Sequence, residues 1–432
     1  MKKFFISNFT VEKLWGHKNY LLELNDDVNV IIGPNASGKT TLINILFDSL
    51  SGNFPRLIRT EFKEVRISLK SFEGAMTRSI RITRNDEELV FYLGKQKYSI
   101  PVGRFLRFGD DFELHDHPAF LTRLNRAIGF DTRELRHELR QLVPAVWLPV
   151  SRRLPIAEEE EVEQRRLHRK PLESVDECLA DLADSLQQYR FALNTELSEL
   201  RLEFQRHALE NILYDKQHDR ALLDLSSFEP PSEHDKQALL KAFQDVGFVD
   251  RRMEKRIDDH FSAANEAAKK MSEADDKIDL ETIFIIPLIN RTREIVKFAQ
   301  ELESKREALF RALHFFETIV NGFLNDKSIQ VSDRGELMII PDRPGASPID
   351  WRHLSSGEKQ ILILLTQALL SEKTPVVYVA DEPELSLHVD WQEKLLNALT
   401  QLAGRCQFIV ATHSPDIASG FGEKVIDLAR LK

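Results

Sequence analysis

A short stretch near the N-terminus combines glycines, a lysine and threonines at a spacing that suits anion binding. Residues 33–41 read GPNASGKTT, follow the apolar run VNVII and precede the helix-forming segment LINILF. Glycines let the backbone curl so that successive N–H groups point inward at an anion, and a helix N-terminus adds partial positive charge. The spacing of Gly33, Gly38, Lys39 and Thr40 therefore predicts a loop that holds the phosphates of a nucleotide.

Each residue type in this phosphate loop has its own expected task. Lys39 reaches the β- and γ-phosphates of ATP, and the Thr40 hydroxyl is a ligand of Mg²⁺. The predicted nucleotide-binding set within the loop is Gly33, Asn35, Ala36, Ser37, Gly38, Lys39, Thr40 and Thr41. The alternative is a chance match in an ordinary strand–turn–helix connection.

Two further motifs follow apolar runs near the C-terminus, and their presence argues against a chance match of the phosphate loop. VVYVADE ends in Asp381 and Glu382, and FIVATHSPD carries His413. A carboxylate at a strand end beside a phosphate loop is suited to bind Mg²⁺, so Asp381 is the second predicted metal ligand. Glu382 can orient or deprotonate the attacking water, and His413 is expected within reach of a γ-phosphate. Glu382 and His413 are therefore the predicted catalytic residues.

Short strands are expected around these motifs at both ends of the chain. Residues 1–110 contain period-two segments such as EVRISLK and RSIRITRND, which predict an antiparallel β-subdomain. Near the C-terminus, SIQVSDRGELMII predicts a hairpin, and VVYVA and QFIVAT are apolar runs of the kind buried in a parallel sheet. We expect an α/β fold in which an N-terminal lobe (1–110) and a C-terminal lobe (326–432) together carry the motifs.

The middle of the chain, residues 111–325, is highly charged and helix-forming. Its apolar residues recur at alternating four- and three-residue spacing over two stretches, 174–215 and 295–323. This spacing favours two long helices packed along a coiled-coil-like seam, although an ordinary helical domain gives the same stripe. The charge run EEEEVEQRRLHRK (158–170) is interpreted as a solvated linker, with a salt-sensitive partner contact as the alternative.

Composition excludes several classes of function. The formal charge of −10 gives no general attraction for nucleic acid or an anionic membrane, so DNA binding would need a local basic patch. Cys178 and Cys406 lie far apart and imply neither a disulfide framework nor a metal site. The longest apolar runs are too short to span a bilayer, and the N-terminus lacks the features of a signal peptide. We expect a cytoplasmic protein without a membrane partner.

The segment HLSSGEKQ at residues 353–360 resembles the LSGGQ signature of ABC-type ATPases. The resemblance implies an ABC-type ATPase head that binds ATP and Mg²⁺. It also implies that Ser355 and the amide of Gly357 bind the γ-phosphate held by a second subunit, so that ATP joins two heads, alone or within a higher oligomer built from dimers. The residues agree with this, because Ser355 would cap a helix whose N-terminal amides attract an anion.

DEPELSLH (381–388) and ATHSPDIA (411–418) resemble the OLD-type group of these ATPases, within the wider RecF- and SMC-like set. Transporter ATPases usually have Asp where this chain has His388. OLD proteins carry a Toprim nuclease after the ATPase, and the 19 residues beyond His413 leave no room for one. Any destructive activity is therefore expected on a separate polypeptide, as in two-gene anti-phage systems of the PARIS type, with the Septu type as a sister alternative.

We therefore expect an ATPase that holds or releases a separate toxic effector, a Toprim-like nuclease, with a phage-encoded trigger or DNA as a further candidate partner. The alternatives are a RecF- or Rad50-like repair ATPase that clamps DNA, a transporter ATPase, and a regulatory protein that hardly hydrolyses ATP. The usual glutamine loop is not recognisable. PAVWLPVSRRLP (144–155) can occupy its place, which makes Arg152 a candidate nucleotide or partner contact, or it can be a buried strand leading into a basic surface loop.

Overall fold

The computed structural model describes residues 3–102, 132–148, 174–211, 213, 232–245, 249–273 and 280–430. The chain divides into two compact units: a head unit of residues 1–187 and 315–432, and a helical unit of residues 188–314. Two long helices, α7 (Ser174–Glu210) and α11 (Leu280–Asn321), contribute residues to both units. The three ranges expected from composition, 1–110, 111–325 and 326–432, remain a prediction.

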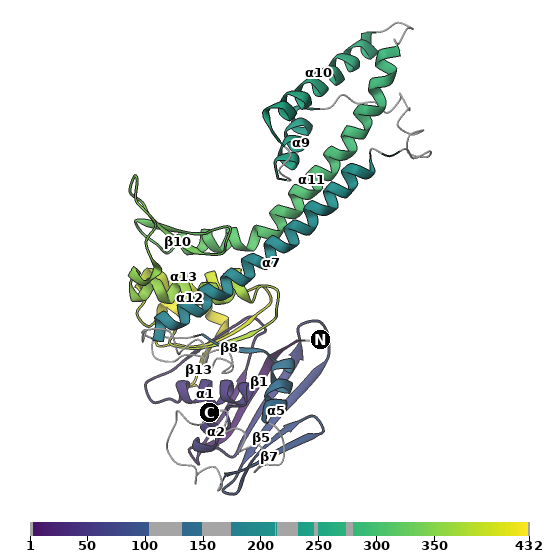
Figure 1. The fold of residues 1–432 in the computed structure, drawn as a ribbon. Coiled ribbons are helices and arrows are strands. Elements are labelled where there is room, and N and C mark those ends of the chain that lie inside the picture. Colours follow the sequence, from purple (N-terminus) through teal and green to yellow (C-terminus); the bar gives the residue numbers. More distant parts are fainter. Residues whose placement is uncertain are drawn as a thin grey trace, which may run out of the picture. The chain divides into compact units, whose positions relative to one another are not determined.

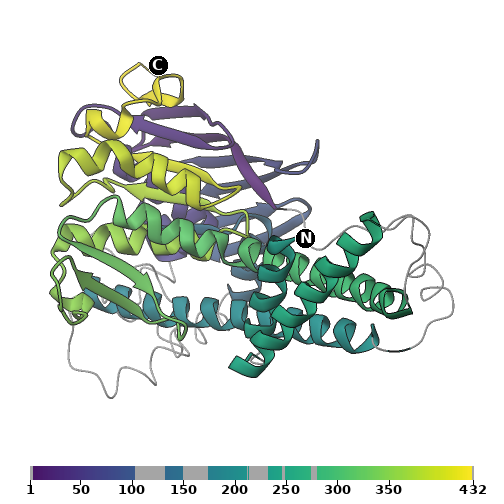
Figure 2. The ribbon, with the colours of Figure 1, turned by 90° about the horizontal axis from the view of Figure 1, so that it is seen from above.

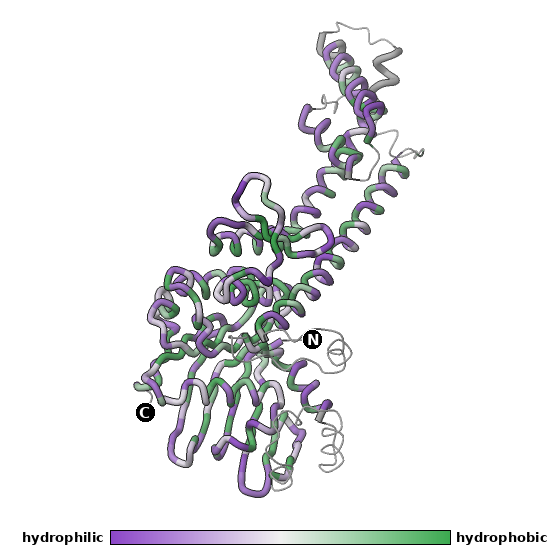
Figure 3. Tube along the Cα trace, turned by 60° about the vertical axis from the view of Figure 1, so that its left-hand side comes forward, coloured by the Kyte–Doolittle hydropathy of each residue, from purple (hydrophilic) through white to green (hydrophobic). Residues whose placement is uncertain are grey.

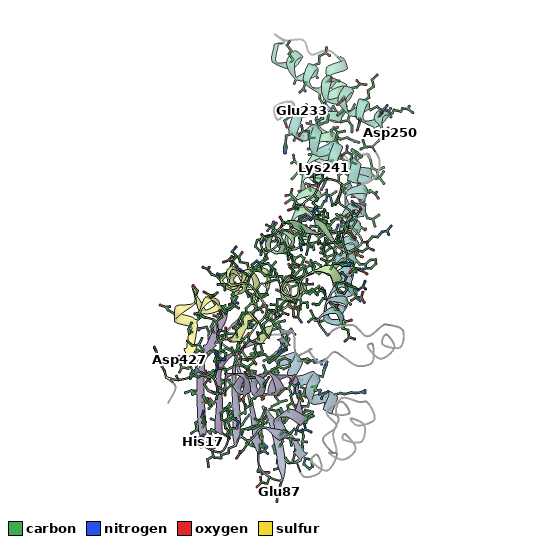
Figure 4. The ribbon with its side chains drawn as sticks, turned by 90° about the vertical axis from the view of Figure 1, so that its left-hand side faces the viewer. His17, Glu87, Glu233, Lys241, Asp250 and Asp427 are labelled. Carbon is green, nitrogen blue, oxygen red and sulfur yellow. The ribbon has the colours of Figure 1, made fainter. Side chains whose placement is uncertain are left out.

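An antiparallel sheet forms part of the head unit (Figure 1). Its strands, in spatial order, are β2 (Lys18–Glu23), β1 (Phe4–Leu14), β4 (Glu64–Ser71), β5 (Thr77–Arg84), β6 (Glu88–Leu93) and β7 (Gln96–Pro101). In β4 the alternate residues Val65, Ile67 and Leu69 are buried, as a half-covered strand requires. Because β1 and β5 run in the same direction, the turns marked by His17 and Glu87 in Figure 4 lie at the same end of the sheet. The predicted β-subdomain is confirmed.

A second, parallel sheet carries the predicted motifs. Its strands, in spatial order, are β13 (Val425–Asp427), β3 (Val28–Ile32), β12 (Gln407–Ala411), β11 (Val377–Asp381) and β8 (Ala145–Trp147). β12 reads QFIVA and is buried throughout, because the strand is covered on both faces. All neighbouring pairs are parallel, so the carboxyl ends of β3, β11 and β12 lie at one edge. Asp427, labelled in Figure 4, ends β13 beside Ile32, the last residue of β3.

Helices and a hairpin complete the described part of the head unit. They are α1 (Lys39–Ser51), α2 (Phe54–Arg59), α5 (Thr132–Leu142), β9 (Lys327–Val331) paired with β10 (Leu337–Pro341), η3 (Trp351–His353), α12 (Ser356–Leu370), α13 (Val389–Leu402), α14 (Pro415–Ala418) and η4 (Gly422–Lys424). The β9–β10 pair confirms the predicted hairpin. α12 and α13 lie side by side (Figure 2). Leu42 and Leu46 of α1 share one core with Ile67 of the antiparallel sheet and Ile409 of the parallel sheet, so α1 packs with both sheets.

A buried glutamine also links the two sheets. The Gln407 side chain is fully buried, and its amide nitrogen donates to the carbonyl oxygens of Ile6 at 2.7 Å and Asn25 at 2.6 Å. Its amide oxygen accepts from the backbone N–H of Ile6 at 2.8 Å. Buried backbone groups need such partners, so Gln407 satisfies groups of the antiparallel sheet from within the parallel one.

The helical unit is built on two antiparallel helices. The segments of α7 and α11 within this unit lie side by side in Figures 1 and 3. Their contacts confirm the direction, because Glu203 pairs with Lys305 at 3.8 Å, whereas the later Asn211 donates to the carbonyl oxygen of the earlier Arg291 at 2.9 Å. The predicted pair of long helices is confirmed. α11 begins before the expected Ile295.

Further helices in this unit were not predicted individually. α9 (Glu233–Asp245) and α10 (Arg251–Glu273) pack on α11, with Leu239, Ile257 and Val296 in one buried cluster. Lys241, labelled in Figure 4, pairs with Glu303 of α11. The described part of α10 is largely hydrophilic in Figure 3, which fits a helix that buries only one face. Pro287 lies inside α11, at a position where a proline usually ends a helix.

Candidate functional site

The phosphate loop joins β3 to α1 through left-handed backbone. Ala36 and Gly38 have φ angles of 63° and 97°. A Cβ atom at Gly38 would lie 2.9 Å from the indole of Trp15, so both the backbone and the available space require glycine. α1 begins at the next residue, which puts its unpaired N-terminal amides at the loop. The local structure is thus the one that the sequence predicted for an anion site.

Lys39 is buried at this loop, where it is 5% exposed. Its Nζ donates to the carbonyl oxygen of Gly33 at 2.8 Å and lies 3.5 Å from Nδ1 of His413. Burial lowers the pKa of the Lys39 ammonium, and the carboxylates of Glu382 and Asp381 oppose this effect. A lysine with little remaining hydration is suited to contact the phosphates that such a loop would hold.

Thr40 and Asp381 bring two oxygen atoms together at the start of α1 and the end of β11. The Thr40 hydroxyl donates to Oδ1 of Asp381 at 3.2 Å. A hydroxyl and one carboxylate are hard donors, and Mg²⁺ typically takes one or two protein oxygens and completes its shell with phosphate and water. In the described ranges no group of three or more His, Cys, Asp or Glu residues could hold a metal ion.

Glu382 and His413 face each other next to this pair. Oε1 of Glu382 lies 3.5 Å from Nε2 of His413, and their side chains are 37% and 40% exposed. Glu382 has a φ angle of 52°, which is strained for a residue with a side chain. Its backbone N–H donates to Ala411 at 2.8 Å, which joins the ends of β11 and β12. The two predicted catalytic side chains are therefore adjacent, and both remain accessible to water.

A third carboxylate, Glu384, was not singled out by sequence analysis. It is buried, and its Oε1 accepts hydrogen bonds from the Thr412 hydroxyl and from the backbone N–H groups of His413 at 3.3 Å and Ser414 at 3.2 Å. Burial raises the pKa of the Glu384 carboxyl, and these hydrogen bonds oppose the increase. No local sequence pattern signals this role, because the donors come from a segment that follows a different strand.

The signature segment begins α12 as predicted. Ser355 is the N-cap, and its hydroxyl accepts from the backbone N–H of Glu358 while the Glu358 carboxylate accepts from the backbone N–H of Ser355. Burial alone would raise the pKa of the Glu358 carboxyl, but hydrogen bonds from Lys327 and Ser355 outweigh it and the pKa is lowered. A Cβ atom at Gly357 would lie 2.9 Å from the carbonyl oxygen of Ser386, so this position requires glycine for packing.

The signature and the phosphate loop are not joined within one chain by the contacts that the structure describes. The side chain of Ser355 bonds to its own helix, to the backbone and side chain of Glu358. Gly357 packs against the segment that follows Glu382, not against the loop at Gly38. Within a single copy, therefore, the described contacts bring Lys39, Thr40, Asp381, Glu382 and His413 together and leave Ser355 and Gly357 outside that group.

Comparison with known proteins agrees with this geometry. The chain matches the family described as AAA ATPase domain (AAA_15) over residues 4–418. It belongs to this family. A curated relative, the probable ATPase of retron Ec83 from Escherichia coli, is 29% identical over 179 residues, which are 39% of this chain and 31% of the relative. The chain thus matches less than a third of that relative's length.

Solved structures of SMC head domains are also similar to this chain of the AAA ATPase domain family. The head domain with an extended coiled coil from Pyrococcus furiosus, bound to the C-terminal domain of ScpA, has 14% identity and a TM-score of 0.40 over 98% of this chain and 93% of that one. The head domain with a coiled coil and joint from Pyrococcus yayanosii has 14% identity and a TM-score of 0.36 over 98% and 95% of the two chains. These scores support no conclusion about how this chain works.

An aromatic group beside the phosphate loop of this family member was also missed by sequence analysis. The indole of Trp15 is 36% exposed and lies against Gly38, and Lys18 lies 5.1 Å from the ring centroid. The hydroxyl of Tyr20 in β2 donates to the carbonyl oxygen of Ser37 at 2.8 Å, which ties this strand to the loop. An aromatic residue in a turn has no distinctive spacing, so only the fold brings Trp15 to the site.

The other predicted residues have less specific surroundings. Asn35 is exposed in the loop, and Thr41 is half-buried in the first turn of α1. Arg152 and the charge run 158–170 lie outside the described residues. The preceding β8 pairs with β11, so the strand expected before Arg152 is present.

Both cysteines are free and buried. Within the described ranges we find no helix with the length and apolar character needed to cross a bilayer.

Proposed function

We propose that this protein binds ATP with Mg²⁺ at the phosphate loop and hydrolyses it in a site shared by two copies of the chain. The supporting observation is the arrangement at one edge of the parallel sheet, where Lys39, Thr40, Asp381, Glu382 and His413 lie together. These residues come from three places in the sequence, and the parallel strands bring them to the same edge. Membership of an ATPase family supports the same assignment.

Each side chain has a role that its position allows. Lys39 binds the β- and γ-phosphates, with the backbone amides of the loop around them. Thr40 and Asp381 hold Mg²⁺, which supplies Lewis-acid stabilisation of the phosphate charge when it is bound. Glu382 orients the attacking water and accepts its proton. His413, between Lys39 and Glu382, donates a hydrogen bond to the transferring phosphoryl group.

Ser355 and Gly357 complete the site of a second copy. The start of α12 offers backbone amides and a partial positive charge, as an anion site requires, yet its described contacts do not include the phosphate loop of its own chain. A twofold arrangement would place each α12 start against the γ-phosphate of the opposite loop. The exposed Leu385 and Val389 lie in the loop and first turn after Glu382, and their burial in a dimer would add apolar contact.

We further propose that the nucleotide state controls a separate effector protein, a nuclease, in an anti-phage system of the PARIS or Septu type. The likeness to the ATPase of a retron is compatible with a defence-related role. The helical unit and adjacent parts of the head unit are the candidate docking surface. DNA binding that falls steeply with salt would instead favour the repair-type alternative.

A complementation experiment tests the shared site. Lys39→Ala leaves a chain with an intact α12 start, and Ser355→Arg leaves a chain with an intact phosphate loop. Each variant alone is expected to hydrolyse almost no ATP. Co-expressed with different affinity tags and purified over both tags, a heterodimer retains one complete site of two and should recover about half of the wild-type rate.

The controls separate assembly from catalysis. Lys95→Ala changes an exposed lysine in the β6–β7 turn. Its pair with Ser355→Arg should also be active, because the Lys95→Ala copy supplies an intact α12 start to the intact phosphate loop of the other copy. A doubly tagged Lys39→Ala and Ser355→Arg complex as inactive as its parents would contradict a site shared between copies. Full activity of Ser355→Arg by itself would contradict it equally.

A further inference from the structure

The segment after β12 is held by a buried carboxylate. One oxygen of Glu384, a residue only 8% exposed, accepts from the Thr412 hydroxyl and from the N–H groups of His413 and Ser414 at 3.3 and 3.2 Å. Its other oxygen, Oε2, is buried and has no hydrogen-bond partner among the described residues. Desolvating a carboxylate is costly, and an incompletely paired oxygen adds to the cost, so packing alone does not account for a glutamate here.

The held segment contains the histidine of the candidate site. His413 lies with Nδ1 3.5 Å from Nζ of Lys39 and Nε2 3.5 Å from Oε1 of Glu382. A shift of the backbone at His413 would therefore change both distances together. Among the described residues, the hydrogen bonds of the Glu384 carboxylate come from residues 412–414, the segment that contains His413.

A second contact holds the same segment from α13. Oε1 of Gln392 accepts from the Ser414 hydroxyl at 2.7 Å, and its Nε2 donates to the carbonyl oxygen of Leu387 at 3.0 Å. Glu384 and Leu387 both belong to the loop between β11 and α13. The segment 412–414 is therefore hydrogen-bonded to the one loop that follows the catalytic carboxylate, directly through Glu384 and indirectly through Gln392.

We propose that Glu384 is a positioning residue, whose buried carboxylate holds residues 412–414 so that the His413 ring stays between Lys39 and Glu382. This inference rests on the proposed ATPase function for its kinetic consequence, but not for the hydrogen bonds themselves. Hydrogen bonds to an ionised carboxylate are stronger than hydrogen bonds between neutral groups. Such bonds suit a contact that must keep the backbone at His413 in place while the charge at the phosphate site changes.

Hydrogen exchange on the nucleotide-free protein tests the hold directly. Glu384→Ala removes the acceptor, so the amide of His413 should exchange at least about tenfold faster, because it opens locally more often. The amide of Ser414 keeps the Thr412 hydroxyl as an acceptor at 2.9 Å and should change less. Glu384→Gln keeps a carbonyl oxygen at the position of Oε1 and should retain most of the protection. Glu393→Ala, an exposed carboxylate on α13, is the matched control and should leave these amides unchanged.

Steady-state kinetics test the consequence. Glu384→Ala should lower kcat for ATP by about 100-fold, the effect of a small misplacement of a catalytic group, with KM within about threefold because the phosphate loop is intact. Glu384→Gln should restore most of kcat. A kcat for Glu384→Ala within about threefold of wild type, or unchanged exchange at residues 412–414, would overturn the proposal.

A milder variant covers the case in which Glu384→Ala does not fold. Thr412→Val keeps the shape and removes the hydroxyl that donates to Glu384 and accepts from the N–H of Ser414. Both faster exchange at His413 and about a tenfold loss of kcat are expected. Wild-type values for both would overturn the proposal. If the wild-type protein hydrolyses no ATP, the proposed function fails, whereas the exchange experiment still decides whether Glu384 holds the segment.

Discussion

In the proposed site, nucleotide binding is expected to depend most on Lys39, because its ammonium is buried at the phosphate loop. Its Nζ is 2.8 Å from the carbonyl oxygen of Gly33, and burial lowers its pKa. A bound phosphate would give this ammonium a strong anionic partner in place of a neutral carbonyl. Substitution of this one residue is therefore a direct test of the nucleotide assignment.

Lys39→Ala is expected to abolish binding of ATP–Mg, since no other side chain in the loop carries a positive charge. Isothermal titration calorimetry measures this directly, with Lys95→Ala as the control for loss of an exposed lysine. Affinity of Lys39→Ala within about threefold of wild type, which corresponds to only ~0.65 kcal/mol, would contradict the assignment.

Trp15→Ala is expected to weaken ATP binding by about 1–3 kcal/mol, the typical contribution of one aromatic side chain stacked on a base. The half-exposed indole lies against Gly38, so a base attached to the bound phosphates can reach it. Titration with ATP and with inorganic triphosphate separates the base from the phosphates. Equal losses for both ligands would show that Trp15 supports the loop and does not stack on the base, and Trp15→Phe should retain most of the affinity for ATP.

The candidate nucleotide site is supported by two sheets and by the helix α1, which packs with both. Gln407 joins the sheets through its bonds to Ile6 and Asn25, and α1 carries Lys39 and Thr40 at its first turn. The edge of the parallel sheet that gathers the motifs is thus held by contacts remote from the nucleotide. Loss of these contacts should reduce stability before it changes the chemistry.

Gln407→Leu is expected to lower the free energy of unfolding by about 2–4 kcal/mol, because the buried backbone N–H and carbonyl of Ile6 lose their side-chain partner. Urea unfolding followed by circular dichroism measures the change. Gln401→Leu, on an exposed position of α13, is the matched control and should change stability little. A difference between the two variants of less than about 0.5 kcal/mol would show that Gln407 does not tie the sheets together.

The proposed purpose of ATP hydrolysis by this protein is the control of a partner. In the proposed system this chain supplies the ATPase and a partner supplies the destructive activity. Glu382→Gln keeps the shape of the side chain and removes the base, so the protein should bind ATP without cleaving it and hold two copies together. A protein trapped in that state is expected to be unable to release its effector.

The corresponding prediction is made in cells challenged with phage. The chain expressed with the product of its neighbouring gene should protect, whereas the chain alone, or the pair carrying Glu382→Gln, should not. Plaque counts measure protection, and a pair carrying Glu393→Gln, an exposed control on α13, should protect normally. Protection by this chain alone, or by the Glu382→Gln pair, would refute control of an effector by the nucleotide.

The sequence by itself determined the local features of this protein. The spacing of GPNASGKTT, the apolar runs before Asp381 and His413, and the Ser355 cap of α12 are set by a few neighbouring residues, so their structures could be predicted before any fold was known. The antiparallel sheet and the long helices were predictable for the same reason, because period-two and seven-residue patterns are local.

Only the tertiary structure decided which distant groups meet. The contact of Trp15 with the phosphate loop, the three hydrogen bonds to Glu384 and the link of Gln407 to Ile6 join residues that no spacing relates. Such contacts depend on strand order and on the direction in which each strand runs, and neither follows from local propensity. The phosphate-loop motif could therefore be predicted from the sequence, whereas the contacts of Trp15, Glu384 and Gln407 depend on how the sheets and α1 pack.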